Sequence, residues 1–376
     1  MRPEHDMMRR LLRARMDRRR FLAASGATMG ALAMGATRVA RAQSPAAVDL
    51  GDTLNLATWP NYHSPDTLQA FTDATGVAVN MTTYGSTEEM EAKIRAGNSG
   101  IDVVVPSQYA IQAWTADGLL AALDYSQLPN VDLSTWDPLF VNQGFDPGNQ
   151  YTIPKNWGTT GIAFWSDQVD PAPASWADFF RMAGEDAYAQ RFQIVDHQIS
   201  SMGSAAVGMG YSLNTVDETE LNAVADMLIA LKPKLYAISS DVQPPLRNQD
   251  TLATIAWTGD GVTVVRDNPD AAKYIVASDG GELWVDSWSI AADAPHKAAA
   301  YAYLDFILQP ENSAIDTEFI LFPHANPAVK ELLSPEVADN PVIYPPTDQL
   351  QKLTFATSEA YNSALRQETW ARIKQS

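Results

Sequence analysis

Residues 53–105 read TLNLATWPNYHSPDTLQAFTDATGVAVNMTTYGSTEEMEAKIRAGNSGIDVVV, and this stretch decides the fold class. It contains three segments with the apolar pattern of β-strands, at Thr53–Trp59, Val77–Tyr84 and Ile101–Val105. The third segment is short and apolar throughout, which is typical of a strand buried on both faces of a parallel sheet.

The segments between these strands carry the start and stop signals of helices. Ser64 followed by Pro65 marks a helix start, because serine caps the first turn and proline fits its first position. Gly76 follows the last apolar residue of that helix and ends it. Strand–helix units repeated in this way predict a parallel, doubly wound α/β sheet. Ligands of such sheets bind beyond the carboxyl ends of the strands.

The rest of the chain continues the alternation without a flexible linker. Further strands are expected at Tyr151–Pro154, Thr160–Trp165, Arg191–Val195, Thr254–Trp257 and Glu282–Ala291. The chain has 376 residues, enough for two domains, and the lack of a linker predicts that it crosses between them more than once. We expect an N-terminal lobe of residues 43–162 and 287–325, and a C-terminal lobe of residues 163–286 and 326–376.

Composition excludes several classes of function. The formal net charge is −19, although residues 1–42 hold ten arginines and three acids, so the remaining chain is more acidic still. An acidic body repels phosphate backbones, which disfavours nucleic-acid binding. The simpler interpretation of the charge is that it keeps an abundant protein dispersed. The chain has no cysteine, which excludes disulfides, thiolate catalysis, zinc–cysteine sites and a lipid anchor on cysteine.

The N-terminus has the order of an export signal. Arg18, Arg19 and Arg20 precede a weakly apolar run at residues 23–37, and an A-x-A cleavage pattern ends at Ala42. The run is too short for a membrane span, which needs about 20 apolar residues. We interpret residues 1–42 as a twin-arginine signal peptide, with a basic tail as the alternative. Export without a lipid anchor predicts a protein of the periplasm.

The segment Glu282–Trp288 contains a pattern suited to binding an amine. Strand side chains alternate between two faces, so Trp284, Asp286 and Trp288 share one face. A carboxylate between indole rings suits an organic ammonium, because it accepts charge-assisted hydrogen bonds and each ring adds ~0.5–2 kcal/mol of cation–π attraction. In the alternative interpretation, the tryptophans are core residues and the aspartate is solvated or caps a neighbour.

Several aromatic residues fall at or near the ends of expected strands. They are Trp59, Tyr62, Tyr109, Trp157 and Trp257. One such residue is usually core packing, but five at strand ends indicate a lined cleft, because amphipathic rings can face both water and ligand.

Motifs of enzymes and metal sites are missing from the sequence. The five histidines form no HExxH or HxH pattern, and no GxSxG, P-loop or GxGxxG sequence occurs. Asp196 and His197 stand close to Ser200 and Ser201, but such neighbours at a helix start are usually capping groups. We therefore expect no enzyme, no cofactor and no metal.

Five blocks of the sequence carry a family resemblance. They are residues 58–62 (TWPNY), 102–109 (DVVVPSQY), 153–158 (IPKNWG), 255–259 (IAWTG) and 280–287 (GGELWVDS). In this order they resemble successive blocks of the periplasmic spermidine/putrescine-binding proteins. The resemblance covers nearly all of the chain after the signal peptide. It implies the type II periplasmic binding protein fold, with two lobes of mostly parallel sheet flanked by helices and a ligand cleft between them.

The resemblance also implies which residues contact the ligand. The matching positions are Trp59, Tyr62, Ser107, Tyr109, Trp257, Trp284 and Asp286. By resemblance, Asp286 anchors an amine, and Trp257 and Trp284 enclose its methylene chain. To these we add Trp157 from the strand-end aromatics and His197 from the helix that supplies acids in the family.

Other positions depart from the family pattern. Asn61 stands where polyamine binders have an acid, His197 and Ser200 replace two more acids, and residues 354–356 lack the family's glutamine. Lys155 adds a positive charge near the expected cleft, unless it and His197 face solvent. A second buried ammonium without a carboxylate would be strongly unfavourable. We therefore expect a ligand with one cationic end and a neutral or anionic other end. A linear diamine stays possible if Asp196 or Asp260 reaches the cleft.

Together these features predict the binding subunit of a polyamine-type ABC importer. Its expected partners are a small amine or zwitterionic solute and an inner-membrane permease with ATPase subunits. We expect a monomer without stable membrane insertion. A periplasmic enzyme and a metal-capturing protein on the same fold are the alternatives; the absence of a Tyr-Tyr pair disfavours the latter.

Overall fold

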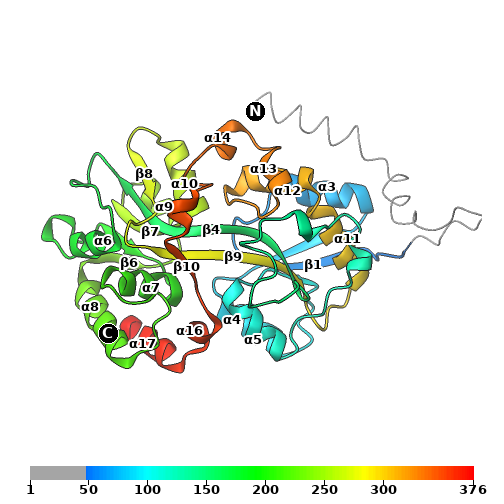
Figure 1. Cartoon of the computed structure of the whole chain (residues 1–376), viewed down its shortest axis with the longest axis horizontal. Helices are drawn as coiled ribbons and strands as arrows, with labels where there is room; N and C mark the ends of the chain where they lie inside the picture. The colour runs from blue at the N-terminus through cyan, green and yellow to red at the C-terminus, as the bar shows by residue number, and fades with distance from the viewer. Residues whose placement is uncertain (1–47) are drawn as a thin grey trace, which may run out of the picture.

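The computed structural model describes residues 48–376, and the twin-arginine signal peptide expected at residues 1–42 lies outside the described residues. The described chain is a mixed α/β structure in which helices pack around a curled sheet (Figure 1). The strands are β1 Thr53–Thr58, β2 Ala78–Thr83, β3 Val103–Val104, β4 Thr152–Trp165, β5 Phe192–Ile194, β6 Leu235–Ile238, β7 Ala253–Trp257, β8 Ala272–Ile275, β9 Gly281–Ile290 and β10 Leu353–Phe355.

Helices occupy most of the segments between the strands. The α-helices are α3 Pro65–Thr75, α4 Thr87–Arg95, α5 Gln108–Ala116, α6 Trp176–Ala183, α7 Gln198–Gly208, α8 Glu218–Leu231, α9 Gln243–Arg247, α10 Thr258–Asp267, α11 Lys297–Ile307, α12 Pro310–Ile320, α13 Pro327–Lys330, α14 Pro335–Ala338, α15 Thr347–Leu350, α16 Ser358–Asn362 and α17 Ala364–Gln375. Short 3-10 helices lie at Tyr125–Gln127, Leu133–Thr135, Asp186–Tyr188 and Lys232–Lys234.

The opening strand–helix units form as predicted. The strands β1, β2 and β3 each lie inside a segment expected to be a strand. The helix α3 begins after Ser64, whose side chain accepts a hydrogen bond from the N–H of Asp66, and ends at Gly76 in the left-handed conformation, with φ of 82°. Only a residue without Cβ takes that conformation at little cost, so Gly76 sets the length of the helix.

The sheet consists of two parallel parts joined by two antiparallel strands. The strand order is β2-β1-β3-β9-β4-β7-β5-β6, with β10 beside β9 and β8 beside β4. In one part β1 pairs parallel with β2 and β3, and in the other β5 pairs parallel with β6 and β7. The long strands β4 and β9 pair antiparallel and run across the middle of the molecule in Figure 1. The predicted α/β class is confirmed.

The strand β4 corrects one expectation. The sequence predicted two strands, Tyr151–Pro154 and Thr160–Trp165, around a loop, whereas β4 is one 14-residue strand that is buried along its whole length. The reason is its pairing with β9, which satisfies its backbone groups on both sides of the expected loop. The register shifts between Pro154 and Asn156, so Lys155 is the extra residue of a β-bulge.

Two large hydrophobic cores lie on either side of this central pair. The first core includes Leu56, Val104 and Trp114, packed between the parallel strands and their helices. The second includes Phe192 and Leu228. Along β4 the first core extends to Trp157 and the second begins at Ile162, so one strand belongs to both. The lobe boundaries stay a prediction.

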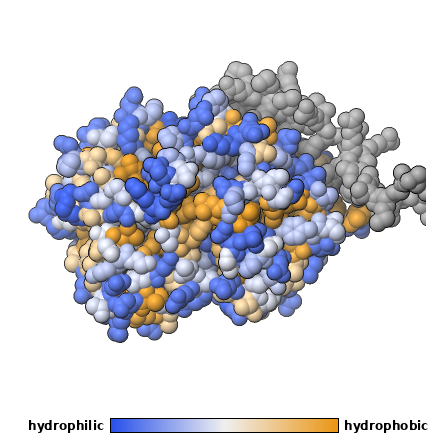
Figure 2. Space-filling model, viewed as in Figure 1, coloured by the Kyte–Doolittle hydropathy of each residue, from blue (hydrophilic) through white to orange (hydrophobic). Residues whose placement is uncertain are grey.

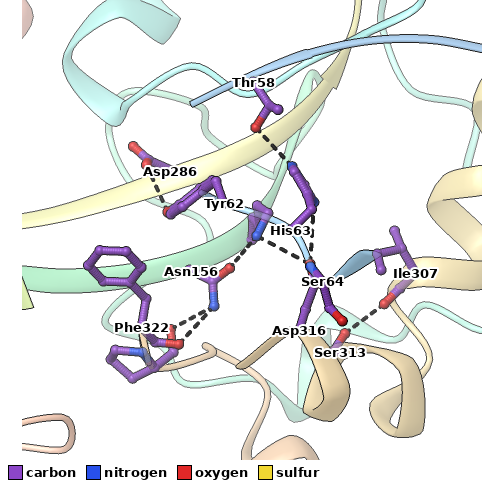
Figure 3. A network of polar contacts seen from close by, with 12 residues as sticks. Thr58, Tyr62, His63, Ser64, Asn156, Asp286, Ile307, Ser313, Asp316 and Phe322 are labelled. Carbon is purple, nitrogen blue, oxygen red and sulfur yellow. Dashed lines mark hydrogen bonds and ion pairs between the residues drawn. The ribbon is translucent and has the colours of Figure 1, made fainter. Parts of the chain in front are cut away.

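A buried cation ties β4 to α12. Lys155 is 1% exposed, which excludes the alternative that it faces solvent. Its Nζ donates to Asn156 Oδ1 at 2.7 Å and lies 3.6 Å from Asp316 Oδ2. Burial lowers the pKa of Lys155 to about 8, so it still carries its proton at pH 7. His63, beside Asp316 (Figure 3), has its pKa lowered to about 4 by burial and is neutral there.

Removing this cation should destabilise the fold. Lys155→Met leaves the buried Asp316 carboxylate without its partner, which should cost about 3–5 kcal/mol of unfolding free energy in urea titrations. Adding Asp316→Asn to the same chain should recover much of the loss, because no buried charge then remains unpaired. The exposed Lys352→Met is the matched control. An unchanged urea midpoint for Lys155→Met would contradict a stabilising pair.

Candidate functional site

A large cavity lies at the carboxyl ends of the parallel strands. Its volume is about 2180 Å³, well above the ~300–1,000 Å³ of an ordinary small-molecule pocket, so it has the size of an open cleft. Residues that follow β1, β3, β5 and β7 contribute to its walls, as the sheet geometry predicted. Figure 2 shows a largely hydrophilic molecular face with hydrophobic residues gathered across its middle.

Most of the predicted site residues meet in this cavity. Its walls include Trp59, Tyr62, Ser107, Tyr109, His197, Trp257, Trp284 and Asp286. Contributions come from both core regions and from β9 between them, so a molecule bound here would touch both sides.

Asp286 is held by two hydroxyl groups from the first core region. The Tyr62 hydroxyl donates to Oδ2 at 2.9 Å, and the Ser107 hydroxyl donates to Oδ1 at 2.5 Å. Figure 3 shows Tyr62 directed at Asp286 while the next residue, His63, is directed away toward Thr58 and Asp316. Both carboxylate oxygens of Asp286 are therefore positioned by donors that come from elsewhere in the chain.

Burial dominates the ionisation of this carboxyl group. Asp286 is 6% exposed, and burial raises its pKa to about 6 although the two hydroxyl donors and the charge of Lys155 act in the opposite direction. The Lys155 ammonium lies 4.1 Å from the centre of the Tyr62 ring, on the residue that donates to Asp286. A buried carboxylate that keeps its charge at pH 7 is suited to a cation.

Glu282 is a second carboxylate in the same cavity, and we did not include it among the expected site residues. It is 1% exposed and lines the cavity. It stands two residues before Trp284 and four before Asp286, so strand alternation alone places all three on one face. The signal was therefore present in the sequence. The expectation of a ligand with one cationic end assumed that Asp286 is the only buried carboxylate of the site. Glu282 supplies a second one, so that reason no longer holds.

His197 belongs to a chain of hydrogen-bonding groups that connects the two sides of the cavity. Its Nε2 lies 3.0 Å from the Tyr109 hydroxyl, and its Nδ1 accepts from the N–H of Ser200 as the cap of α7. The Tyr109 hydroxyl lies 3.0 Å from Thr87 Oγ1. The contact between Tyr109 and His197 joins α5 of one core region to α7 of the other.

Hydrolase geometry is not formed around His197. Asp196 pairs instead with Lys374, at 2.9 Å. The Ser200 hydroxyl donates to Glu282, and the Ser201 hydroxyl donates to the carbonyl of Val195. Ser200 Oγ also lies 2.9 Å from His197 Nδ1, but Glu282 competes for its single proton, and Asp196 is not placed to orient the imidazole as the third member of a catalytic triad.

Aromatic rings form the apolar part of the cavity wall. Trp257 donates from Nε1 to Ser200 Oγ at 3.3 Å. Trp284 packs edge-on to Phe322 with ring centroids 5.1 Å apart, and its ring lies over Gly158. A Cβ at position 158 would come within 2.4 Å of that ring, so glycine there lets Trp284 lie flat against β4.

Trp157 does not line the cavity, in contrast to its prediction as a site residue. It pairs with Val285 across the β4–β9 ladder, whereas Asp286 pairs with Asn156, so Trp157 points to the opposite face. Its ring stacks on Phe140 at 4.6 Å within the first core. Trp288 shares a strand face with Asp286 but is 1% exposed and packs on Tyr303.

Two other polar residues of the cavity wall, Asn61 and Asp260, are explained by their local surroundings. Asn61 has φ of 57°, a left-handed conformation that asparagine tolerates better than most residues, so the turn after β1 gives a backbone reason for it. Asp260 accepts a hydrogen bond from the Gln243 amide at 2.6 Å, and burial raises its pKa.

Neither a clustered metal-ligand set nor a membrane-spanning helix is present among residues 48–376. Within residues 48–376, no group of three or more His, Asp or Glu side chains has the arrangement of a metal site. No helix in that part of the chain has the length and apolar character needed to span a bilayer.

Comparison with known proteins identifies relatives over most of the chain. The family model of bacterial extracellular solute-binding proteins matches residues 66–345. The spermidine/putrescine-binding periplasmic proteins of Salmonella typhimurium and Escherichia coli are each 33% identical over 349 residues, covering 92% of this chain and 96% of the relative.

A solved structure shows the same architecture. It is the substrate-binding protein of a spermidine/putrescine ABC transporter from Streptococcus pneumoniae, with a TM-score of 0.72 and 28% identity over 86% of this chain and 99% of that one. The predicted two-lobed periplasmic binding protein fold is thereby confirmed.

Neutralising Asp286 should stabilise the ligand-free protein at neutral pH. Its pKa is raised from 3.8 to about 6 on folding, so stability present below pH 4 is lost as the pH rises through 6. Asp286→Asn carries no charge and should be more stable than the unchanged protein at pH 7, by on the order of 2 kcal/mol. At pH 4 the difference should shrink. Urea unfolding at both pH values measures it, with the exposed Asp250→Asn as control. Equal destabilisation at both pH values would contradict a buried charge at this position.

Proposed function

The chain belongs to the bacterial extracellular solute-binding protein family, and we propose that it captures a small amine-containing solute in the periplasm for an ABC importer. In this proposal residues 1–42 direct export and are removed near Ala42. The mature monomer then passes its ligand to an inner-membrane permease with ATPase subunits. Both relatives are named spermidine/putrescine-binding periplasmic proteins, which supports an amine as the ligand class.

The observation that carries the proposal is the environment of Asp286. Its carboxylate is buried in a cavity whose walls are indole and phenol rings, and hydroxyl donors fix its orientation. An ammonium group would supply the positive charge that the carboxylate lacks there. The faces of Trp257 and Trp284 would cover a methylene chain and add cation–π attraction of about 0.5–2 kcal/mol.

Closure around the ligand explains how binding could be signalled to a permease. The walls of the cavity belong to both core regions, which share the β4–β9 pair. A ligand that contacts both sides favours the conformation in which they are closest, because its contacts exist in full only there. No covalent step is needed. Against the enzyme alternative, Asp196 pairs with Lys374 and the Ser200 hydroxyl donates to Glu282, so Asp196, His197 and Ser200 do not form a triad.

Ligand binding should depend on the charge of Asp286. In thermal-denaturation assays, spermidine, putrescine or a simple monoamine at a hundred times its Kd should stabilise the protein by ~2.7 kcal/mol. Asp286→Asn should abolish this shift although its fold is intact. Asp241→Asn is the matched control, because Asp241 also lines the cavity but is exposed. If no amine stabilises the unchanged protein, or if Asp286→Asn retains full affinity, the proposal is wrong.

Affinity should also fall in acid. Because the pKa of Asp286 in the ligand-free protein is about 6 and a cation binds its ionised form, Kd should rise roughly tenfold between pH 7 and pH 5. The charged groups that act on Asp286 are Lys155 and Glu282, and Lys155 stays protonated throughout this range. Isothermal titration calorimetry with putrescine, whose amines also stay protonated, measures the effect. A Kd that is constant over this interval would exclude Asp286 as the titrating anchor.

A further inference from the structure

The cavity contains two buried carboxylates on one face of one strand. Glu282, Trp284 and Asp286 occupy every second position of β9, so their side chains share one face of the strand, and all three line the cavity. At 3.2–3.4 Å per residue, the Cα atoms of Glu282 and Asp286 are roughly 13 Å apart. The indole of Trp284 lies between them. An apolar surface with an anionic group at each end is complementary to a molecule with two cationic groups joined by an apolar spacer.

The carboxylate of Glu282 has one oxygen that is held and one that is free of hydrogen bonds. Its Oε2 accepts from the Thr160 hydroxyl at 2.6 Å and from the Ser200 hydroxyl at 2.7 Å. Within residues 48–376, no hydrogen bond is found to Oε1. Ser200 lies in the first turn of α7, where the helix dipole favours a nearby negative charge. The protein thus holds Glu282 in place and leaves an acceptor available.

No cation of the described chain pairs with Glu282. The ion pairs formed by residues 48–376 do not include it, and Arg366, the buried arginine whose charge interacts with it, makes no ion pair with it. An unpaired buried carboxylate is costly, and a structural role would be served as well by a neutral glutamine. A cationic ligand group would remove this cost on binding, which is the arrangement expected of a recognition residue.

We propose that Glu282 anchors a second cationic group of the ligand and therefore decides whether the cleft prefers dicationic solutes to monocationic ones. The inference rests on the proposed function, in which Asp286 holds the first cationic group. It replaces the expectation of a ligand with a single cationic end. Ser200, in the first turn of α7, carries no charge and instead orients the glutamate of the neighbouring strand.

Asp260 is the competing candidate for this role. It also lines the cavity, but it lies on α10, accepts from the Gln243 amide and has the Arg247 charge acting on it. A cation therefore acts on each of the two carboxylates at long range, Arg247 on Asp260 and Arg366 on Glu282, and neither forms an ion pair within residues 48–376. Glu282 also shares its strand face with Trp284 and Asp286, which Asp260 does not.

Calorimetric titration with matched amines tests the proposal. The probes are butylamine, the zwitterion 4-aminobutanoate, putrescine, spermidine and longer terminal diamines. They are titrated into the unchanged protein, Glu282→Gln, Asp260→Asn and the exposed cavity-rim control Glu336→Gln. Glutamine still accepts the hydrogen bonds of Thr160 and Ser200, so Glu282→Gln removes the charge with little change of shape. Thermal unfolding without ligand checks that each variant folds.

We expect the unchanged protein to bind its preferred di- or oligoamine more tightly than butylamine. Glu282→Gln should raise the Kd of that ligand roughly ten- to hundredfold, while the Kd of butylamine should change by no more than about twofold. The proposal fails if Glu282→Gln weakens the binding of the preferred amine and of butylamine equally, or of neither. It also fails if Asp260→Asn alone removes the preference for the di- or oligoamine, or if 4-aminobutanoate is the tightest ligand. If no amine binds the unchanged protein, the proposed function itself fails, so the two failures are distinguishable.

Discussion

The antiparallel pairing of β4 with β9 is the constraint on which the site depends. These strands are buried along their length and carry side chains of both core regions, so their register sets what each region presents to the cavity. Trp284 can lie against β4 only because Gly158 is opposite it. The bulge at Lys155 turns that side chain toward Asp316 beneath Tyr62. One backbone ladder thus positions an anion, an aromatic wall and the cation behind them.

The electrostatics of the site divide its charges into two classes. Lys155 and Asp316 form a buried ion pair inside the fold. Such a pair matters for stability mainly because removing one partner leaves the other charge buried and unpaired. Asp286 and Glu282 accept hydrogen bonds from hydroxyl groups and form no ion pair within residues 48–376, although the charges of Lys155 and Arg366 act on them from a greater distance. Hydroxyl donors orient a carboxylate without neutralising it, so the negative charge remains for a ligand. The protein accepts lower stability at these positions, as functional sites often do.

Local signals were sufficient for the architecture of the first strand–helix units. Ser64, Pro65 and Gly76 act within a few residues of where they stand, and α3 begins and ends where they predict. Period-two alternation likewise identified the face of β9 that carries Trp284 and Asp286. The same alternation places Glu282 on that face, two residues before Trp284. The prediction of Trp157 as a site residue was wrong, because strand-end position alone does not say which face of a central strand a ring occupies.

By itself, the sequence determined the fold class, the capping of the helices and the sharing of one strand face by a carboxylate and an indole, because these follow from backbone geometry and short-range periodicity. Tertiary structure alone decided that Trp157 packs on Phe140, that Lys155 is buried against Asp316, and that Tyr62 and Ser107 reach Asp286. These outcomes depend on the β4–β9 register and on contacts between residues up to 224 positions apart in the chain. A local sequence pattern cannot encode contacts between residues that are so far apart in the chain, because these contacts depend on how whole helices and strands pack.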